Sequence, residues 1–488
     1  MRPKAVLINP NSMIGSYEGR LGKFVLPVPP QGIAYLGAVL ERDGWDVRLV
    51  DQYATKEANE SLIASIARDR PDMIGLSVLT PAMRNAERLI RGLRAKAPEA
   101  KIVLGNTHAT VFARELCEQG LADVCVRGEG EATLADLAGR LAAGASLQGC
   151  LGITYVDAAG EVREEPDRPL IENLGALPYP AWRLLDIKLY PSAPLIALHE
   201  VALPVQASRG CPYQCTFCGQ ESIYRKVRYR DDESVLDEIE FLHGTFGVKH
   251  VGFVDAYYPI DVEQGLAYCE AHMRRGLHKR LRWLTETRVD KVSRELLHAM
   301  KRSGCSLIMY GFEVGDQAIL DGIRKGFTLD QAEAAMRWTR EAGILTLGLF
   351  MMGNPGESRE TAMKTIRWAK KLDCDIAKFN LAVPLPGSTF YEMVKHRLGE
   401  AGLTHPEKFT SWYDWSKEAG DLIFTPEGMS SAELAGLQKR AMLEFYLRPK
   451  LILRHLARGS ISPAHLVQGG WAVVADFLKS RGLALGAA

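Results

Sequence analysis

The chain has 488 residues, of which 47% are hydrophobic and 24% are charged, and its formal net charge is +1. A chain of this length exceeds the size at which one core keeps growing, so we expect two or three domains of globular composition. The small net charge argues against a protein that coats nucleic acid, and the lack of a run of about eighteen apolar residues argues against a spanning helix.

Residues 1–145 alternate between short β-rich apolar runs and segments with helical spacing, which predicts a doubly wound parallel sheet. The five predicted strands are residues 5–8, 47–50, 73–78, 102–104 and 124–126. The chain enters the first of them without a signal-peptide pattern. In such sheets the ligand lies beyond the carboxyl ends of the strands, at the switch point.

The loops at those strand ends combine small residues with amide and hydroxyl groups. Small residues let a large planar ligand approach the backbone, and the polar groups can hold its rim. The candidate residues for this ligand are Asn9, Pro10, Asn11, Gln31, Gly32, Ser77, Thr80, Gly105, His108, Arg127, Gly128, Glu129 and Gly130.

Residues 146–200 are rich in proline, which favours extended chain over continued helix, so this stretch is predicted to be a linker. From residue 201 to about 395 a second alternation begins. Six strands are predicted, at residues 201–205, 250–254, 281–286, 306–310, 344–350 and 377–381. The helix before the fifth strand has a capping box at Thr328 to Gln331 and a terminal Gly343.

Three cysteines, Cys211, Cys215 and Cys218, follow the first of these strands with the spacing C-x3-C-x2-C. They can ligate three irons of a [4Fe-4S] cluster and leave the fourth iron open, as a catalytic metal requires. A structural zinc site would need a fourth ligand close by, but the next histidine is His243 and the next cysteine is Cys269. A disulfide would leave one of the three thiols unpaired. The other six cysteines are scattered, which suits a reducing cytoplasm.

This cysteine loop resembles the cluster-binding motif of the radical S-adenosylmethionine (SAM) enzymes, in which SAM chelates the open iron. The resemblance implies a partial (β/α)6 barrel and reductive cleavage of SAM to a 5'-deoxyadenosyl radical. It is supported by five segments in the family's order, at the carboxyl ends of the later strands. The SAM-binding residues that it implies are Phe217, Gly219, Asp255, Glu313, Arg324, Lys325, Gly353, Asn354 and Pro386. For Asp255, as for Glu286 and Arg288, bracing of the barrel mouth is an equal alternative to ligand contact.

The loops of residues 1–145, with residues 28–32, resemble the cobalamin-binding domain that precedes the radical domain in one radical SAM subgroup. A flavodoxin-like nucleotide or redox domain is the alternative for this region. The D-x-H-x-x-G motif of other cobalamin proteins is absent at residues 9–14, so we expect no axial histidine from this loop. His108 either lies near the ligand or is a hydrogen-bonded histidine at a helix start.

Residues 396–488 are predicted to be a helical region. The basic amphipathic segment 448–458 either packs on the barrel or lies on an anionic membrane surface. Four aromatic residues here could line a substrate cavity or fill the core: Trp412, Tyr413, Trp415 and Trp471.

The resemblance as a whole is to the subgroup of the anaerobic magnesium-protoporphyrin ester oxidative cyclase and the cobalamin-dependent radical SAM methyltransferases. It implies an oxygen-sensitive cytoplasmic enzyme with a [4Fe-4S] cluster, SAM and cobalamin, which methylates an unactivated carbon of a small molecule. A lipid, a tetrapyrrole and a natural-product precursor are all candidate substrates, and flavodoxin or ferredoxin would supply electrons. Oxidative cyclisation or rearrangement without methyl transfer is one alternative, and a non-catalytic cobalamin or redox sensor is another.

Overall fold

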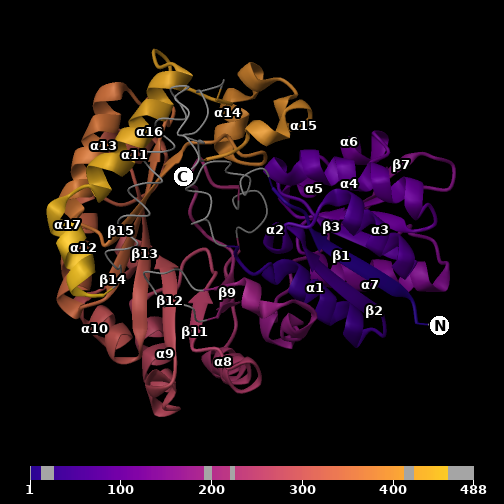
Figure 1. Cartoon of the computed structure of the whole chain (residues 1–488), viewed down its shortest axis with the longest axis horizontal. Helices are drawn as coiled ribbons and strands as arrows, with labels where there is room; N and C mark the ends of the chain where they lie inside the picture. Colours follow the sequence, from indigo (N-terminus) through magenta and orange to yellow (C-terminus); the bar gives the residue numbers. More distant parts are fainter. Residues whose placement is uncertain (1, 13–26, 192–200, 220–225, 412–421, 460–488) are drawn as a thin grey trace, which may run out of the picture.

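The computed structural model describes residues 2–12, 27–191, 201–219, 226–411 and 422–459. Two α/β parts lie side by side, and helices from the end of the chain cover the second part and reach the first (Figure 1). Trp412, Tyr413, Trp415 and Trp471 lie outside the described residues, so their predicted roles stay open.

The first part is built on a seven-stranded sheet with the strand order β2-β1-β3-β4-β5-β6-β7. Its first five strands are parallel, as predicted, and β6 and β7 are antiparallel additions at one edge. The strands are β1 (Lys4–Asn9), β2 (Asp46–Asp51), β3 (Met73–Ser77), β4 (Lys101–Gly105), β5 (Val124–Val126), β6 (Ile153–Val156) and β7 (Val162–Glu164).

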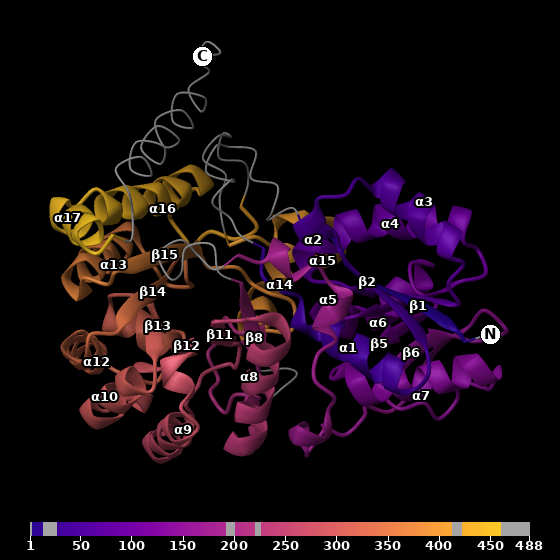
Figure 2. The same cartoon turned by 60° about the horizontal axis from the view of Figure 1, so that its bottom comes forward.

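Helices cover both faces of this sheet, which makes it doubly wound (Figure 2). The first and last helices pack on one face, and the middle helices pack on the other. The helices are α1 (Gln31–Arg42), α2 (Gln52–Thr55), α3 (Asn59–Asp69), α4 (Met83–Lys96), α5 (Thr107–Val111), α6 (Ala113–Glu118) and α7 (Gly130–Ala143).

The first sheet extends beyond the predicted domain boundary at residue 145, because β6 and β7 lie in the predicted linker. Because β6 pairs with β5, the backbone of β5 is not left as an exposed edge of the sheet. The predicted boundary at residue 395 falls inside α14 (Thr389–Leu398). After it, α15 (Ala401–Thr404) and a 3-10 turn at Pro406–Lys408 return to the first part, where Arg84 donates to the Thr404 carbonyl.

The second part is a six-stranded, all-parallel sheet with the order β15-β14-β13-β12-β11-β8, so β8 and β15 are its two edges as described. The six predicted strands are confirmed, with small shifts at their ends. They are β8 (Ala202–Val205), β11 (His250–Phe253), β12 (Arg282–Thr287), β13 (Cys305–Glu313), β14 (Leu345–Met352) and β15 (Ile376–Leu381). A short hairpin, β9 (Ser208–Arg209) with β10 (Arg228–Tyr229), flanks the cysteine loop.

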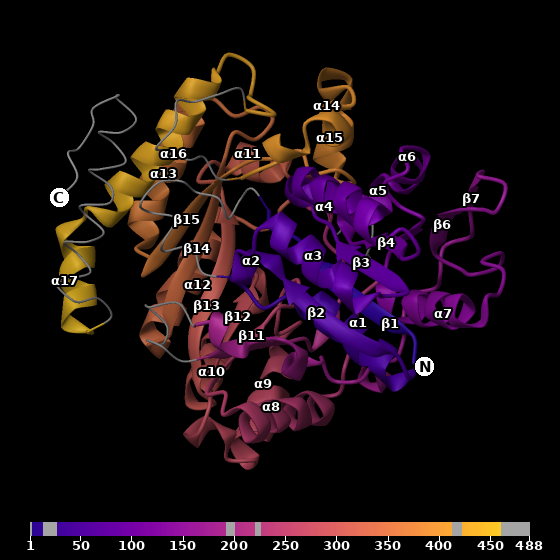
Figure 3. The same ribbon diagram turned by 45° about the vertical axis from the view of Figure 1, so that its right-hand side comes forward.

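Helices line the outer face of this partial barrel (Figure 3). They are α8 (Asp232–Phe246), α9 (Val262–Arg274), α10 (Arg294–Arg302), α11 (Gln317–Gly322), α12 (Leu329–Ala342) and α13 (Arg359–Leu372). The predicted capping box from Thr328 to Gln331 is present, and Gly343 ends α12 with a φ of 73°. Local sequence signals therefore set the ends of this helix.

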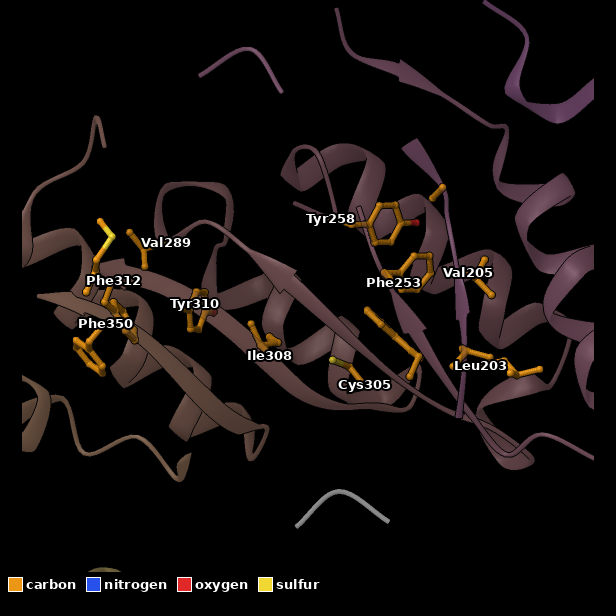
Figure 4. Close-up of a cluster of buried hydrophobic side chains, with 14 of the residues drawn as sticks. Leu203, Val205, Phe253, Tyr258, Val289, Cys305, Ile308, Tyr310, Phe312 and Phe350 are labelled. Atoms are coloured by element: carbon orange, nitrogen blue, oxygen red, sulfur yellow. The ribbon is translucent and has the colours of Figure 1, made fainter. Parts of the chain in front are cut away.

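Buried aromatic rings join the strands to the outer helices (Figure 4). Phe350 is central, with ring centroids 5.6 Å from Phe312, 5.1 Å from Phe379 and 6.3 Å from Trp368 on α13. Alternate residues of each strand thus pack against the helices, which leaves the intervening residues on the opposite face.

Among the described residues that follow, two helices are formed, α16 (Ser431–Tyr446) and α17 (Pro449–Ala457). The basic residues of the α17 segment pair with two carboxylates at the base of the barrel: Arg448, Lys450 and Arg454 with Asp373, and Arg454 and Arg458 with Asp375. These ion pairs support the packed interpretation of the basic helix. No helix among the described residues is long and apolar enough to cross a membrane.

We predict that Phe350→Ala destabilises the barrel by about 3 to 5 kcal/mol, because it removes a fully buried ring and leaves a cavity. Leu453→Ala is the control, since Leu453 is 64% exposed and should cost less than about 0.5 kcal/mol. Calorimetric melting curves of the two variants give the comparison, and equal thermal midpoints would contradict the packing described.

Candidate active site

A cavity lies between the carboxyl edge of the first sheet and the cysteine loop of the second part. Its empty volume, counted out to its solvent mouth, is about 1210 Å³. The first part contributes strand ends and loops, and the second part contributes Gln206, Ser208, Arg209, Gly210, Val254 and Ala256. The cavity therefore joins the predicted cobalamin site to the residue that precedes Cys211.

Seven of the predicted cobalamin-binding residues line this cavity: Gln31, Gly32, Ser77, Gly105, Gly128, Glu129 and Gly130. A Cβ added at Gly105 would meet no atom within 4 Å, so this lining glycine leaves open space for a ligand. Gly75, which sequence reasoning did not select, also lines the cavity. The glycine-lined wall fits a large planar group such as the cobalamin ring.

The other six predicted residues are not part of the cavity lining. Asn9 donates to Asp51 across 2.8 Å, and the Asn11 amide donates to Gln52 across 2.9 Å. Pro10 lies between them. These residues therefore brace the ends of β1 and β2.

His108 is fully buried at the start of α5, where its Nδ1 lies 3.1 Å from the hydroxyl of Thr80. Its ring is 4.8 Å from that of Phe112, and burial lowers the pKa of His108 to about 4. The structure thus matches the hydrogen-bonded alternative for His108. Thr80, predicted to bind cobalamin, is its buried partner and is not part of the cavity lining. No histidine is among the described residues that line the cavity.

Arg127 points to the antiparallel edge of the first sheet instead of the cavity. Its guanidinium donates to Thr154, to the Glu165 carbonyl and to Asp167. Because β6 and β7 were not predicted, sequence reasoning could not supply these partners. Arg127 therefore joins β5 to the added strands.

The cysteine loop is held at its base by backbone hydrogen bonds to two distant segments. The Thr216 amide donates to Ile323 across 3.0 Å, and the Phe390 amide donates to Thr216 across 2.7 Å. Cys215 is buried, whereas Cys211 and Cys218 are half-buried. Within the described ranges no three His, Cys, Asp or Glu side chains already form a metal-ligating group. The prediction of these ligands therefore still depends on their spacing and position.

Two cations lie beside the buried thiol. Burial raises the pKa of Cys215, while the charges of Lys325 and Arg288 act against that rise. Arg288 also covers the ring of Tyr213, inside the loop, at 3.5 Å from its centroid. A thiolate is the form that binds iron, so these cations fit a cluster at this loop.

Glu313 and Lys325, both predicted to bind SAM, form a buried pair with a separation of 2.6 Å. Burial alone would lower the pKa of Lys325, but Glu313 and Cys215 outweigh it and the pKa is raised. Glu313 has a φ of 62° and Arg324 a φ of 55°, which are strained for non-glycine residues. Lys325 also lies 5.6 Å from the ring centroid of Phe217. The predicted SAM residues Phe217, Glu313 and Lys325 thus gather near the cysteine loop. Arg324 is exposed and directly follows Ile323, whose carbonyl accepts from the Thr216 amide.

The other predicted SAM residues have mixed surroundings. Asp255 is buried and accepts hydrogen bonds from Ala207 and Ser208, which is the bracing alternative. Burial raises the pKa of Asp255 to about 7. The amides of Gly353 and Asn354 donate to Glu357. Pro386 is buried and Gly219 is half-buried beside Cys218.

A buried ion network connects the cavity to the cysteine loop. Glu129 pairs with Arg209 at 3.3 Å and with Arg228 at 2.8 Å, and Glu131 pairs with Arg209. The four side chains are 11% exposed or less. Burial would raise the pKa of Glu129, but Arg228, the Ile171 amide and Arg209 lower it overall. Sequence reasoning missed both arginines, although Arg209 stands two residues before Cys211.

We predict that Glu129→Gln lowers the free energy of unfolding by about 3 to 5 kcal/mol, because it leaves two buried arginines without their shared carboxylate. Glu172→Gln is the matched control, since Glu172 pairs with Lys226 on the surface and should cost less than about 1 kcal/mol. Since the pKa of Glu129 is lowered from 4.5, the stability that its carboxylate gives the wild-type protein is full above pH 4.5 and is lost as the pH falls further. Denaturation of both variants at several pH values tests this, and equal losses would contradict it.

Comparisons with known proteins agree with this arrangement. The family described as "B12 binding domain" matches residues 18–138. The family described as "Radical SAM superfamily" matches residues 205–369. These two matches fall on the first sheet and on the barrel, in the predicted order.

Individual relatives span most of the chain. An uncharacterized methyltransferase of Pyrococcus horikoshii is 32% identical over 435 residues, covering 88% of this chain and 90% of the relative. The anaerobic magnesium-protoporphyrin IX monomethyl ester cyclase of Cereibacter sphaeroides is 31% identical over 456 residues, covering 92% and 71%.

The fold also matches a solved structure, the radical SAM methyltransferase TsrM of Kitasatospora setae with cobalamin and a [4Fe-4S] cluster bound. The TM-score is 0.68 at 19% identity, covering 95% of this chain and 90% of that one. The predicted fold class is therefore confirmed. The chain belongs to the radical SAM enzymes that carry a B12-binding domain, a family whose cofactors are cobalamin, SAM and a [4Fe-4S] cluster.

Proposed function

We propose that this enzyme transfers a methyl group from SAM to an unactivated carbon of a small organic substrate. The observation that carries the proposal is one cavity with two kinds of lining. Glycines at the strand ends of the first sheet form one side, and residues just before the cysteine loop form the other. A methyl carrier held there would face the region where SAM is cleaved. Bound cobalamin supplies methyl transfer, and the cluster supplies the electron that cleaves SAM.

The residues of this chain provide position and charge for that chemistry. Gly105 and Gly128 leave room for the corrin ring, and Ser77 and Gln31 offer polar groups at its rim. Cys211, Cys215 and Cys218 would hold the cluster. Lys325 and Glu313 would hold polar groups of SAM beside the cluster. Arg324 and Phe217 would lie at the edge of this SAM site.

Oxidative cyclisation is the second candidate function. The cyclase of Cereibacter sphaeroides is 31% identical over 92% of this chain, which supports this alternative. Nothing in the described cavity separates cyclisation from methyl transfer. The two reactions differ in the products that they form from SAM.

We further propose a cytoplasmic enzyme that takes its electrons from a flavodoxin or a ferredoxin. All nine cysteines are thiols and none is in a disulfide, which suits a reducing compartment. A reduced carrier protein is needed because each SAM cleavage consumes one electron.

The first test is the fate of SAM in anaerobically reconstituted protein with cobalamin and a chemical reductant. We predict that both S-adenosylhomocysteine and 5'-deoxyadenosine form, and that omission of cobalamin abolishes only the former. Cys215→Ala should abolish 5'-deoxyadenosine, because it removes a cluster ligand. Mass spectrometry gives the products. Formation of 5'-deoxyadenosine and methionine alone, with cobalamin present, would overturn methyl transfer in favour of cyclisation.

A second test concerns the cobalamin cavity. We predict that Gly105→Trp weakens cobalamin binding at least tenfold, because the new side chain enters open space that the ligand would occupy. Gly139→Trp is the control, since Gly139 is exposed on α7 away from the cavity and also has open space around it. Absorbance titration with hydroxocobalamin measures both. Equal affinities would show that the ligand does not occupy this cavity.

A further inference from the structure

Lys378 on β15 and Glu286 on β12 are charged side chains on the face of the barrel sheet opposite the helices. The neighbours of Lys378 fix its direction. Ala377 is bonded through its backbone to the Tyr446 hydroxyl of α16, and the Phe379 ring lies 6.0 Å from Phe445 of the same helix. Because side chains alternate along a strand, Lys378 points to the opposite face, where it is exposed.

The direction of Glu286 follows in the same way. Trp283 packs on Tyr268 of α9 at 5.5 Å, and Thr285 is fully buried on that same side. Glu286 therefore faces inward, where it is half-buried. Burial raises the pKa of Glu286 to about 7, the charges of Lys325 and Lys378 act against the rise, and Glu313 adds to it. The strand register pairs Glu286 with Met309 of β13, and Met309 with Leu347 of β14.

Neither side chain has a hydrogen bond or an ion pair among the described residues, although other charged groups here do. Lys325 is bonded to Glu313, and Arg288 is bonded to Asp290. No hydrogen bond or ion pair involves the side chain of Lys378 or of Glu286 within the ranges that the structure describes. An ammonium that a bound ligand removes from water needs an anion as its partner.

The strand register puts Lys378 next to the predicted SAM residues. Lys378 is paired with Leu349, and Leu349 is paired with Gly311. A Cβ added at Gly311 would lie 2.6 Å from Glu313 and 2.8 Å from Lys325. Leu349 thus separates Lys378 from the Glu313–Lys325 pair, and it offers an apolar surface between them.

We propose that Lys378 binds an anionic group of the substrate, a carboxylate or a phosphate, and that Glu286 accepts a hydrogen bond from a donor group on the same molecule. The apolar row between them, with Leu349, Leu347 and Met309, would contact the carbon skeleton. The substrate is then an organic anion with a hydroxyl or ammonium group. This inference rests on the proposed function, because it assumes that the substrate reacts inside the barrel.

The test measures binding without turnover, in protein reconstituted with the cluster, cobalamin and S-adenosylhomocysteine. The probes are 4-phenylbutyrate, 3-phenylpropyl phosphate and the neutral 4-phenylbutyramide. Wild-type protein should bind at least one anion tenfold more tightly than the amide, and which anion it prefers identifies the group. Lys378→Met should remove the difference and Lys378→Arg should keep it. Lys96→Met, at an exposed position at the end of α4, should change nothing.

A second comparison tests Glu286. The para-aminomethyl derivative of the preferred anion should bind wild-type protein more tightly than the parent, and Glu286→Gln should remove that gain. Equal binding of anions and amide, or a preference that survives Lys378→Met, would overturn the proposal. So would a tenfold loss of SAM affinity in Lys378→Met, because Lys378 would then belong to the SAM site. Failure of methyl transfer alone would change the SAM products and leave these affinities as they are.

Discussion

The ion network around Glu129 is the interaction on which the relative position of the two cofactor sites depends. Arg209 and Arg228 are directly opposite each other in the β9–β10 hairpin, an arrangement that repels unless an anion lies between them. Glu129 supplies that anion from the loop after β5, next to the cavity glycines. The hairpin that begins the cysteine loop is therefore stabilised by a carboxylate from the first part of the chain. This contact fixes the position of the cavity relative to the loop.

Charge balance also explains the surroundings of the cysteine loop. Three thiolates in one short loop repel each other, and cations nearby reduce that cost. Arg288 covers Tyr213 and donates to the Lys325 carbonyl, so it joins the loop to the segment that follows α11. Lys325 in turn is held by Glu313, which adopts a left-handed backbone conformation. The two cations are thus positioned by contacts that do not involve the cysteines.

The sequence was sufficient for features that depend on local pattern. Strand and helix periodicity predicted the parallel strands of both sheets, and the Thr328 capping box predicted the start of α12, because these signals act over a few residues. Loop composition found the cavity glycines but not which side chains point into the cavity. Arg127 and His108 stand in the right loops and turn toward β6 and Thr80 instead. Arg209 and Glu129 are 80 residues apart, and no spacing rule connects such positions.

The carboxylates at the barrel mouth differ in what they contact, and this difference identifies the one available to a substrate. Asp255 and Glu357 accept hydrogen bonds from backbone amides, and burial raises the pKa of each to about 7. Glu313 is paired with a lysine. Each of these three has partners that a ligand would have to displace. Glu286 lies at the same edge and has no hydrogen bond or ion pair among the described residues, so a substrate donor can reach it without displacing one.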